Sequence, residues 1–401
     1  MKLYVSQSSA AAGCVAVDDM ILTTDQPTAA GSKMLDGYMS LFGAEVVEKI
    51  KAAGYEVGGK VNVGEFSIDM LGETSFYGEC ADESGKLAGA VAEVVKADDV
   101  KASLTLDVNG MPRRAAAIAK TVFLKPTYGT VSRYGTIPVA CSGETVGVMA
   151  NTTANLRDVL EAVIGHDDKD GTSLSDEKCA LLKRDSDFKA VKKIAVIKAM
   201  TDKVDGAVAA DIDAFKAVAE KNGIEVCEID GSELLAAKAA WNVLMSAELC
   251  NNVSRYDGVK YGYRTPNYTN IDELYTNSRT EAFGMLLKSA ILYGSQSLLY
   301  TEKNRGAYDK SLRVRRVVYD YMAKLFEEYD ALLMPVCSKA AYTKADTDSN
   351  ITLSFEENVY TAPASITGLP AVVVNGVQLV GKAFSDSALL AVAEICEKEG
   401  K

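Results

Sequence analysis

The sequence predicts an α/β fold in which one mixed, largely parallel central sheet is covered by helices on both faces. Apolar runs of strand length alternate with helical periodicities along the 401 residues. Residues 193–229 read as strand, helix and strand, which is typical of a right-handed parallel βαβ unit. No linker, low-complexity stretch or internal repeat interrupts this alternation. We therefore expect a single domain over residues 1–401.

The first half of the chain contributes strands and helices in turn. The expected strands are at residues 15–23, 55–62, 103–108 and 123–126, and the expected helices at 41–54, 86–97, 113–120 and 154–164. In the helix at 41–54, Val46, Val47 and Ile50 recur at helical spacing, and Gly54 is placed to terminate it. The strand at 123–126 ends at Pro126, which cannot donate to a sheet ladder.

The second half continues the alternation. Further strands are expected at residues 193–198, 224–229, 331–335 and 371–380, and helices at 209–222, over most of 272–326 and at 385–399. Gly223 follows the helix at 209–222 as a C-terminal cap. Ser232 can N-cap a further long helix, because its side chain can accept from the first turn.

Composition excludes several classes of function. The formal charge of −12 argues against a broad phosphate-binding surface, so we do not expect direct nucleic-acid binding. The eight cysteines form no CxxC pair, which favours reduced thiols over a zinc site or a disulfide framework. The one histidine, His166, lies in the polar run GHDDKDGTS, so a serine–histidine triad and a histidine-rich metal site are not expected.

The sequence predicts a cytoplasmic protein without a cofactor. The amino-terminal run MKLYVSQSSAAAGCVAV is poorer in apolar residues than a secretory signal. No window offers the roughly 18 consecutive apolar residues that a membrane span needs.

The segment FLKPTYGTVSRYG, residues 123–135, resembles the loop that closes the signature region of the amidase-signature family. Other segments resemble the family in the same order, and the resemblance is greatest to the A subunits of glutamyl-tRNA(Gln)/aspartyl-tRNA(Asn) amidotransferases. These segments are residues 15–36, 45–66, 165–173, 255–264, 278–284 and 361–371. The resemblance implies an amidase-signature fold over almost the whole chain, with the family's early helices missing.

The resemblance also implies where a Ser-cisSer-Lys triad would lie. The family's base lysine matches Asp18, in the run Val-Asp-Asp-Met. The loop that carries the bridging serine falls near residues 83–89, with Gly85 at that position and Ser84 beside it. Counting back from the LKPTYG segment places the attacking serine at Met111. All three triad positions are thus expected to be substituted.

The positions matched to the family's substrate pocket differ as well. They are Asn109, Gly110, Ala290 and Asn358. An arginine that holds the substrate in the amidotransferases matches Ala290, and an aspartate matches Asn358. A triad without base or nucleophile cannot form an acyl-enzyme. The favoured hypothesis is therefore a pseudoenzyme that acts as a structural or regulatory subunit.

Two other functions stay open. The first is an active amidase or glutamine-dependent amidotransferase with a relocated nucleophile, for which Ser84, Cys80 and Cys141 are the candidates. The second is a binding protein that uses an acidic cleft containing Asp18, Asp19 and Asp107 for a cationic ligand.

The run RYDGVKYGYR, residues 255–264, interleaves cations with tyrosines, as in a nucleic-acid patch. The resemblance favours a family-type loop near the cleft instead.

The expected partner is a protein: an amidotransferase-type subunit, an active paralogue or a second copy of the chain.

Overall fold

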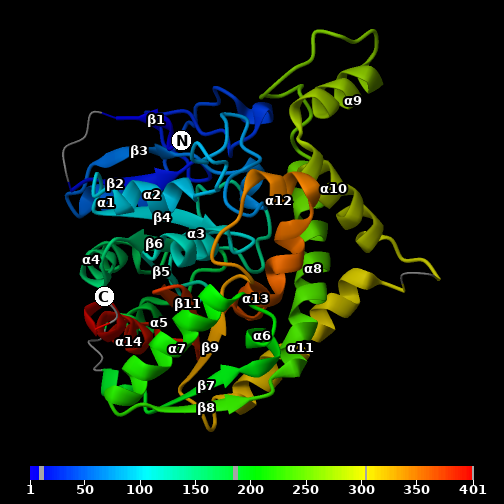
Figure 1. The fold of residues 1–401 in the computed structure, drawn as a ribbon. Coiled ribbons are helices and arrows are strands. Elements are labelled where there is room, and N and C mark those ends of the chain that lie inside the picture. Colours follow the sequence, from blue (N-terminus) through cyan, green and yellow to red (C-terminus); the bar gives the residue numbers. More distant parts are fainter. Residues whose placement is uncertain (9–12, 184–187, 303–304, 400–401) are drawn as a thin grey trace.

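The computed structural model describes residues 1–8, 13–183, 188–302 and 305–399, and its strands form one eleven-stranded sheet (Figure 1). The sheet order is β1-β3-β2-β4-β6-β5-β10-β11-β9-β7-β8. The strands are β1 (Tyr4–Gln7), β2 (Val15–Asp18), β3 (Val57–Val61), β4 (Ala102–Asp107), β5 (Val122–Lys125), β6 (Thr145–Ala150), β7 (Lys193–Ile197), β8 (Glu225–Ile229), β9 (Ala331–Pro335), β10 (Ala371–Val374) and β11 (Val377–Gly381).

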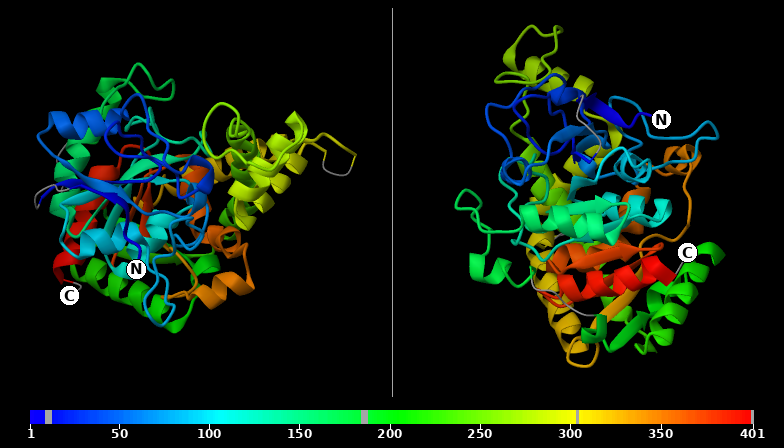
Figure 2. Two further views of the ribbon diagram at one scale, coloured as in Figure 1. Left: turned by 90° about the horizontal axis from the view of Figure 1, so that it is seen from above. Right: turned by 90° about the vertical axis from the view of Figure 1, so that its left-hand side faces the viewer.

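Helices flank this sheet, and the α/β fold with a mixed sheet is confirmed (Figures 1 and 2). The α-helices are α1 (Glu45–Ala52), α2 (Ala90–Lys96), α3 (Met111–Ala119), α4 (Thr153–Val163), α5 (Asp176–Cys179), α6 (Lys198–Thr201), α7 (Gly206–Lys221), α8 (Ala236–Val253), α9 (Ile271–Ala282), α10 (Met285–Leu298), α11 (Ala307–Leu325), α12 (Lys344–Ser349), α13 (Leu353–Thr367) and α14 (Asp386–Glu399). Helices α8, α10 and α11 pack together beside the sheet, and α9 projects from the body (Figure 1).

The expectation that most strand pairings are parallel is wrong. Among the described strands, β2 pairs in parallel with β3 and β4, and β7 with β8 and β9, whereas the six remaining pairings are antiparallel. Connections without a crossover helix explain part of the difference. Asn375 and Gly376, both with positive φ, turn β10 directly back into β11. The segment from β5 to β6 likewise contains no crossover helix, so the two strands run antiparallel.

The predicted βαβ unit is confirmed, since β7 and β8 pair in parallel with α7 between them. Ser232, however, does not N-cap a long helix. It begins a short 3-10 turn, Ser232–Leu235, and its hydroxyl donates to Asp230. Strands β1 and β6 and helices α12 and α13 have no counterpart among the predicted elements.

The FLKPTYG segment is fixed by contacts at both ends of its loop. The backbone N–H and the hydroxyl of Thr127 donate to the carboxylate of Asp386 at 2.8 and 2.6 Å, which ties the loop to α14. Gly129 has a φ of +82°, and a Cβ there would lie 2.5 Å from the carbonyl oxygen of Thr172. The positive φ and the close approach of Thr172 thus both require glycine at position 129 of the motif.

Lys125, the last residue of β5, is fully buried, and its ammonium donates to the carbonyl oxygen of Leu369 at 3.2 Å. Burial lowers the pKa of Lys125 to about 7, although the charge of Asp107 opposes the shift. None of the described helices is long and apolar enough to cross a membrane.

The buried lysine makes folding stability depend on pH. Between pH 7 and 9 the unfolded chain still holds the Lys125 proton that the folded chain releases, so this group makes stability rise with pH. We expect the rise in unfolding free energy from pH 7 to 9 to be smaller in Lys125→Met than in the wild type, by about 2 kcal/mol. Urea unfolding at pH 7, 8 and 9 measures this difference. Lys96→Met, on the exposed side of α2, is the control, and equal pH slopes in all three proteins would contradict the account.

Candidate functional site

The predicted site lies at one edge of the sheet. Strands β3, β2 and β4 are parallel neighbours, so their carboxyl ends meet at the same edge. Asp18 ends β2, Asn109 follows β4, and Met111 begins α3. The residues that the resemblance matched to the base and to the nucleophile therefore lie at the same edge of the sheet.

Asp18 is completely buried and its carboxylate accepts three hydrogen bonds. The donors are the Thr105 hydroxyl at 2.8 Å and the backbone N–H groups of Leu106 and Met20 at 2.7 and 3.0 Å. Burial raises the pKa of Asp18, and these hydrogen bonds oppose the shift. Its oxygens are thus already engaged within the fold.

A buried lysine lies beside two buried carboxylates at this edge. The ammonium of Lys60, on β3, donates to the carbonyl oxygen of Ile21. Burial lowers the pKa of Lys60 to about 8, while the charges of Asp19 and Asp18 oppose the shift. Asp19 accepts from backbone N–H groups at 3.0 and 3.1 Å, and burial raises its pKa to about 6. The three side chains therefore form an internal charge cluster.

Met111 is the first residue of α3 and its side chain is only 1% exposed. The backbone N–H of Gly110, just before it, donates to Asp107 at 2.9 Å, and Pro112, just after it, has no N–H. The carboxylate of Asp107 also pairs with buried Arg113 at 2.7 Å. The start of α3 therefore offers few donors to an anionic oxygen.

Asn109 and Asn358 belong to one hydrogen-bond network of buried and half-buried side chains, which we call the asparagine network: Asn109, Asn358, Arg114, Trp241 and Asn242. The Asn109 side-chain oxygen accepts from the Asn358 amide at 2.6 Å and from the Trp241 indole at 3.3 Å. The Asn358 oxygen accepts from the Arg114 guanidinium at 2.7 Å. The polar groups of these two pocket positions are thus partners of each other.

The other two pocket positions flank this network. A Cβ on Gly110 would lie 2.6 Å from the Thr361 side chain, so α13 packs directly on the start of α3. Ala290, on α10, lines a cavity of about 270 Å³ together with Asn242. The Asn358 amide donates to the Asn242 side chain at 2.7 Å. Asn242 thus connects Asn358 to the cavity that Ala290 lines. The four matched positions, Asn109, Gly110, Ala290 and Asn358, therefore belong to one region.

The candidate relocated nucleophiles lie in different environments. Ser84 is exposed in a turn, where its hydroxyl donates to Asp82 at 2.6 Å, and Gly85 follows it with a φ of +79°. Cys80 is buried, and burial raises its thiol pKa to about 12. Burial also raises the thiol pKa of Cys141. Neither cysteine has the depressed pKa that an attacking thiolate needs.

The remaining sequence motifs have structural partners. The His166 ring, in an exposed loop, lies 3.0 Å from both the Leu174 carbonyl oxygen and Asp168. In the RYDGVKYGYR loop, Tyr256 is buried against Phe66, so its ring is unavailable for base stacking. No group of three or more metal-binding side chains is arranged to hold a metal ion among the residues that the structure describes.

Sequence reasoning missed Arg114, Trp241 and Asn242 as parts of the site. Trp241 is the one tryptophan of the chain, and it is buried on α8. A single tryptophan was a usable signal for a buried polar contact, because a buried indole N–H needs a hydrogen-bond acceptor. Its partner, Asn109, lies 132 residues away in the sequence.

The chain is similar to known proteins over nearly its whole length. The family model described as Amidase matches residues 6–390. The chain is 33% identical over 398 residues to the A subunit of glutamyl-tRNA(Gln) amidotransferase from Latilactobacillus sakei, covering 94% of this chain and 80% of that protein. It is 32% identical over 412 residues to the protein of the same name from Coxiella burnetii, covering 96% and 83%.

Solved structures show the same fold. The A subunit of glutamyl-tRNA(Gln) amidotransferase from Thermotoga maritima superimposes with a TM-score of 0.80 at 24% identity, covering 99% of this chain and 87% of that chain. The urea amidolyase of Kluyveromyces lactis gives a TM-score of 0.81 at 22% identity, covering 96% of this chain and 23% of that chain. The chain belongs to the amidase-signature family.

Proposed function

We propose that this chain is a catalytically inactive member of the amidase-signature family that acts in the cytoplasm as a structural or regulatory subunit. The observation that carries the proposal is the burial of Met111 at the start of α3, where the resemblance places the attacking serine. A thioether carries no proton to lose and cannot form an acyl-enzyme by the family's route. Removal of the attacking group alone usually eliminates most of the chemical rate.

The surroundings of Met111 support the same proposal. The Asp18 carboxylate, matched to the base, already accepts from three donors of the fold, the Thr105 hydroxyl and two backbone N–H groups. The asparagine network joins the residues that in an active relative would hold substrate. Asn109 and Asn358 already bond to protein partners, so a polar substrate at these two side chains would replace existing hydrogen bonds and gain little.

The relatives support a role within a larger assembly. Both curated relatives are named as the A subunit of an amidotransferase, and the chain covers at least 80% of each. The partner we propose is a protein, with an amidotransferase-type subunit, an active paralogue and a second copy of the chain as the alternatives.

An active amidase or amidotransferase is the competing function, and one observation favours it. Lys60 is buried near Asp18, and burial lowers its pKa to about 8, which is the property that a lysine base requires. Its ammonium, however, donates to the Ile21 carbonyl oxygen rather than to a serine. A cationic ligand at Asp18 and Asp107 has less support, because these carboxylates already accept from protein donors.

The first prediction concerns activity. We expect the purified chain to release no more ammonia than a buffer blank from glutamine, asparagine or a simple aryl amide, because Met111 supplies no nucleophile. A coupled ammonia assay measures this, with a catalytically active amidotransferase as the positive control. Turnover that is abolished by Cys80→Ala, Ser84→Ala or Cys141→Ala would instead establish a relocated nucleophile.

The second prediction concerns the asparagine network, which the proposal treats as part of the packed core. Asn358→Ala removes the amide that bonds to Asn109 and the oxygen that accepts from Arg114. We expect a loss of about 1–3 kcal/mol in unfolding free energy, because buried polar groups lose their partners. Asn251→Ala, at an exposed position on α8, is the matched control and should change stability by less than about 1 kcal/mol. Equal stability of Asn358→Ala and wild type in urea unfolding would show that the network is not structural.

A further inference from the structure

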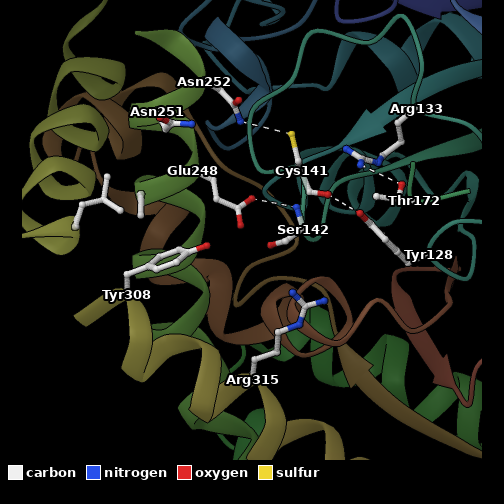
Figure 3. A pocket seen from close by; sticks show the side chains of 12 residues that line it. Tyr128, Arg133, Cys141, Ser142, Thr172, Glu248, Asn251, Asn252, Tyr308 and Arg315 are labelled. Atoms are coloured by element: carbon white, nitrogen blue, oxygen red, sulfur yellow. Dashed lines mark hydrogen bonds between the residues drawn. The ribbon is translucent and has the colours of Figure 1, made fainter. Parts of the chain in front are cut away.

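The largest cavity among those described has a volume of about 640 Å³ and is separate from the edge site. It lies between the loop after β5, the carboxyl-terminal half of α8 and the first turns of α11 (Figure 3). Neither Met111 nor Asn358 lines it. Trp241 lies between the two regions: its indole bonds to Asn109, and a Cβ on Gly143, next to the cavity residue Ser142, would lie 2.5 Å from its ring.

The charged groups of the cavity leave one cation without a counter-ion. Arg133 pairs with buried Glu144 at 2.9 Å. Glu248 accepts from the backbone N–H of Ser142 at 3.0 Å. Arg315, which points into the cavity from α11, makes no hydrogen bond or ion pair within the residues that the structure describes (Figure 3). Among the described residues, Arg315 and Glu248 are therefore the two lining charges without an ion-pair partner, and Arg315 is the one that can pair with an anionic group of a ligand.

Two buried polar groups in the cavity wall also lack a partner among the residues that the structure describes. They are the hydroxyl of Ser142 and the Nε–H of Arg133. A buried donor without a partner costs about 1–3 kcal/mol, which an acceptor on a ligand would offset. Both groups can donate a hydrogen bond. Like the unpaired guanidinium of Arg315, they would therefore suit an acceptor that carries negative charge.

The rest of the lining is largely apolar. Leu298 and Ala247 contribute aliphatic surface, and Tyr128 and Tyr308 contribute rings. The Tyr128 hydroxyl already donates to the Cys141 carbonyl oxygen at 2.6 Å, so its ring is the part that remains for a ligand. A bare inorganic anion would leave this apolar surface uncovered.

We propose that this cavity binds an organic carboxylate with an apolar body. The carboxylate pairs with Arg315, the Ser142 hydroxyl donates to it, and the apolar body lies against the tyrosine rings and Leu298. The Glu248 carboxylate, in the same wall, disfavours ligands with a second negative charge. This binding is independent of whether the edge site is active.

Calorimetric titration with phenylacetate tests the proposal. We expect saturable binding that Arg315→Gln weakens at least about tenfold, the loss expected for one charged hydrogen bond. Arg316→Gln is the matched control, because Arg316 is exposed and pairs with Asp320 at 2.9 Å on the same helix. It should leave the Kd unchanged. The neutral amide phenylacetamide and inorganic phosphate should each bind at least about tenfold more weakly than phenylacetate.

A second readout uses Cys141, a thiol in the cavity lining. Phenylacetate should slow its modification by a maleimide, measured by peptide mass spectrometry, and should do so less in Arg315→Gln. Absence of saturable phenylacetate binding, equal binding of phosphate or phenylacetamide, or an unchanged Kd in Arg315→Gln would each overturn the proposal. Ammonia release from phenylacetamide would count against the inactive edge site alone.

Discussion

The hydrogen bonds among Arg114, Asn358 and Asn109 are the constraint on which the site region depends. These side chains are buried, so each polar atom needs a partner within the protein. Several of these atoms find partners in one another, across segments that lie far apart in the sequence, whereas the Arg114 Nε–H has no partner among the described residues. Because helix α3 carries Arg114 and helix α13 carries Asn358, satisfying these groups also fixes how the two helices pack.

The same contacts link the fold to the proposed loss of activity. Arg113 extends from α3 to the Thr361 carbonyl oxygen and the Ser365 hydroxyl of α13, at 2.8 and 2.6 Å. Gly110 leaves no room for a Cβ against Thr361. Contacts of this kind stabilise the core whether or not chemistry takes place beside them. An amidase-signature fold can therefore persist with a methionine at position 111.

Much of the fold could be predicted because its strands and helices have clear periodicity, as in β7, α7 and β8. The edge location of Asp18 and Met111 followed from the resemblance, and the parallel pairing of β2 and β4 places both there. The network partners could not be predicted, because hydrogen bonds between residues more than 100 positions apart leave no local pattern. Helix α13 was missed since it contains Pro363, which normally ends a helix.

The cavity near Arg315 lies apart from Met111 and Asn358, neither of which lines it. The most direct test of the central claim is the intact mass of the protein after exposure to a diazoketone analogue of glutamine, which alkylates an activated serine or cysteine. With Met111 at the start of α3 and both candidate thiols raised in pKa, the mass is expected to stay unchanged. One equivalent of adduct on a serine or cysteine, prevented by excess glutamine, would contradict the account.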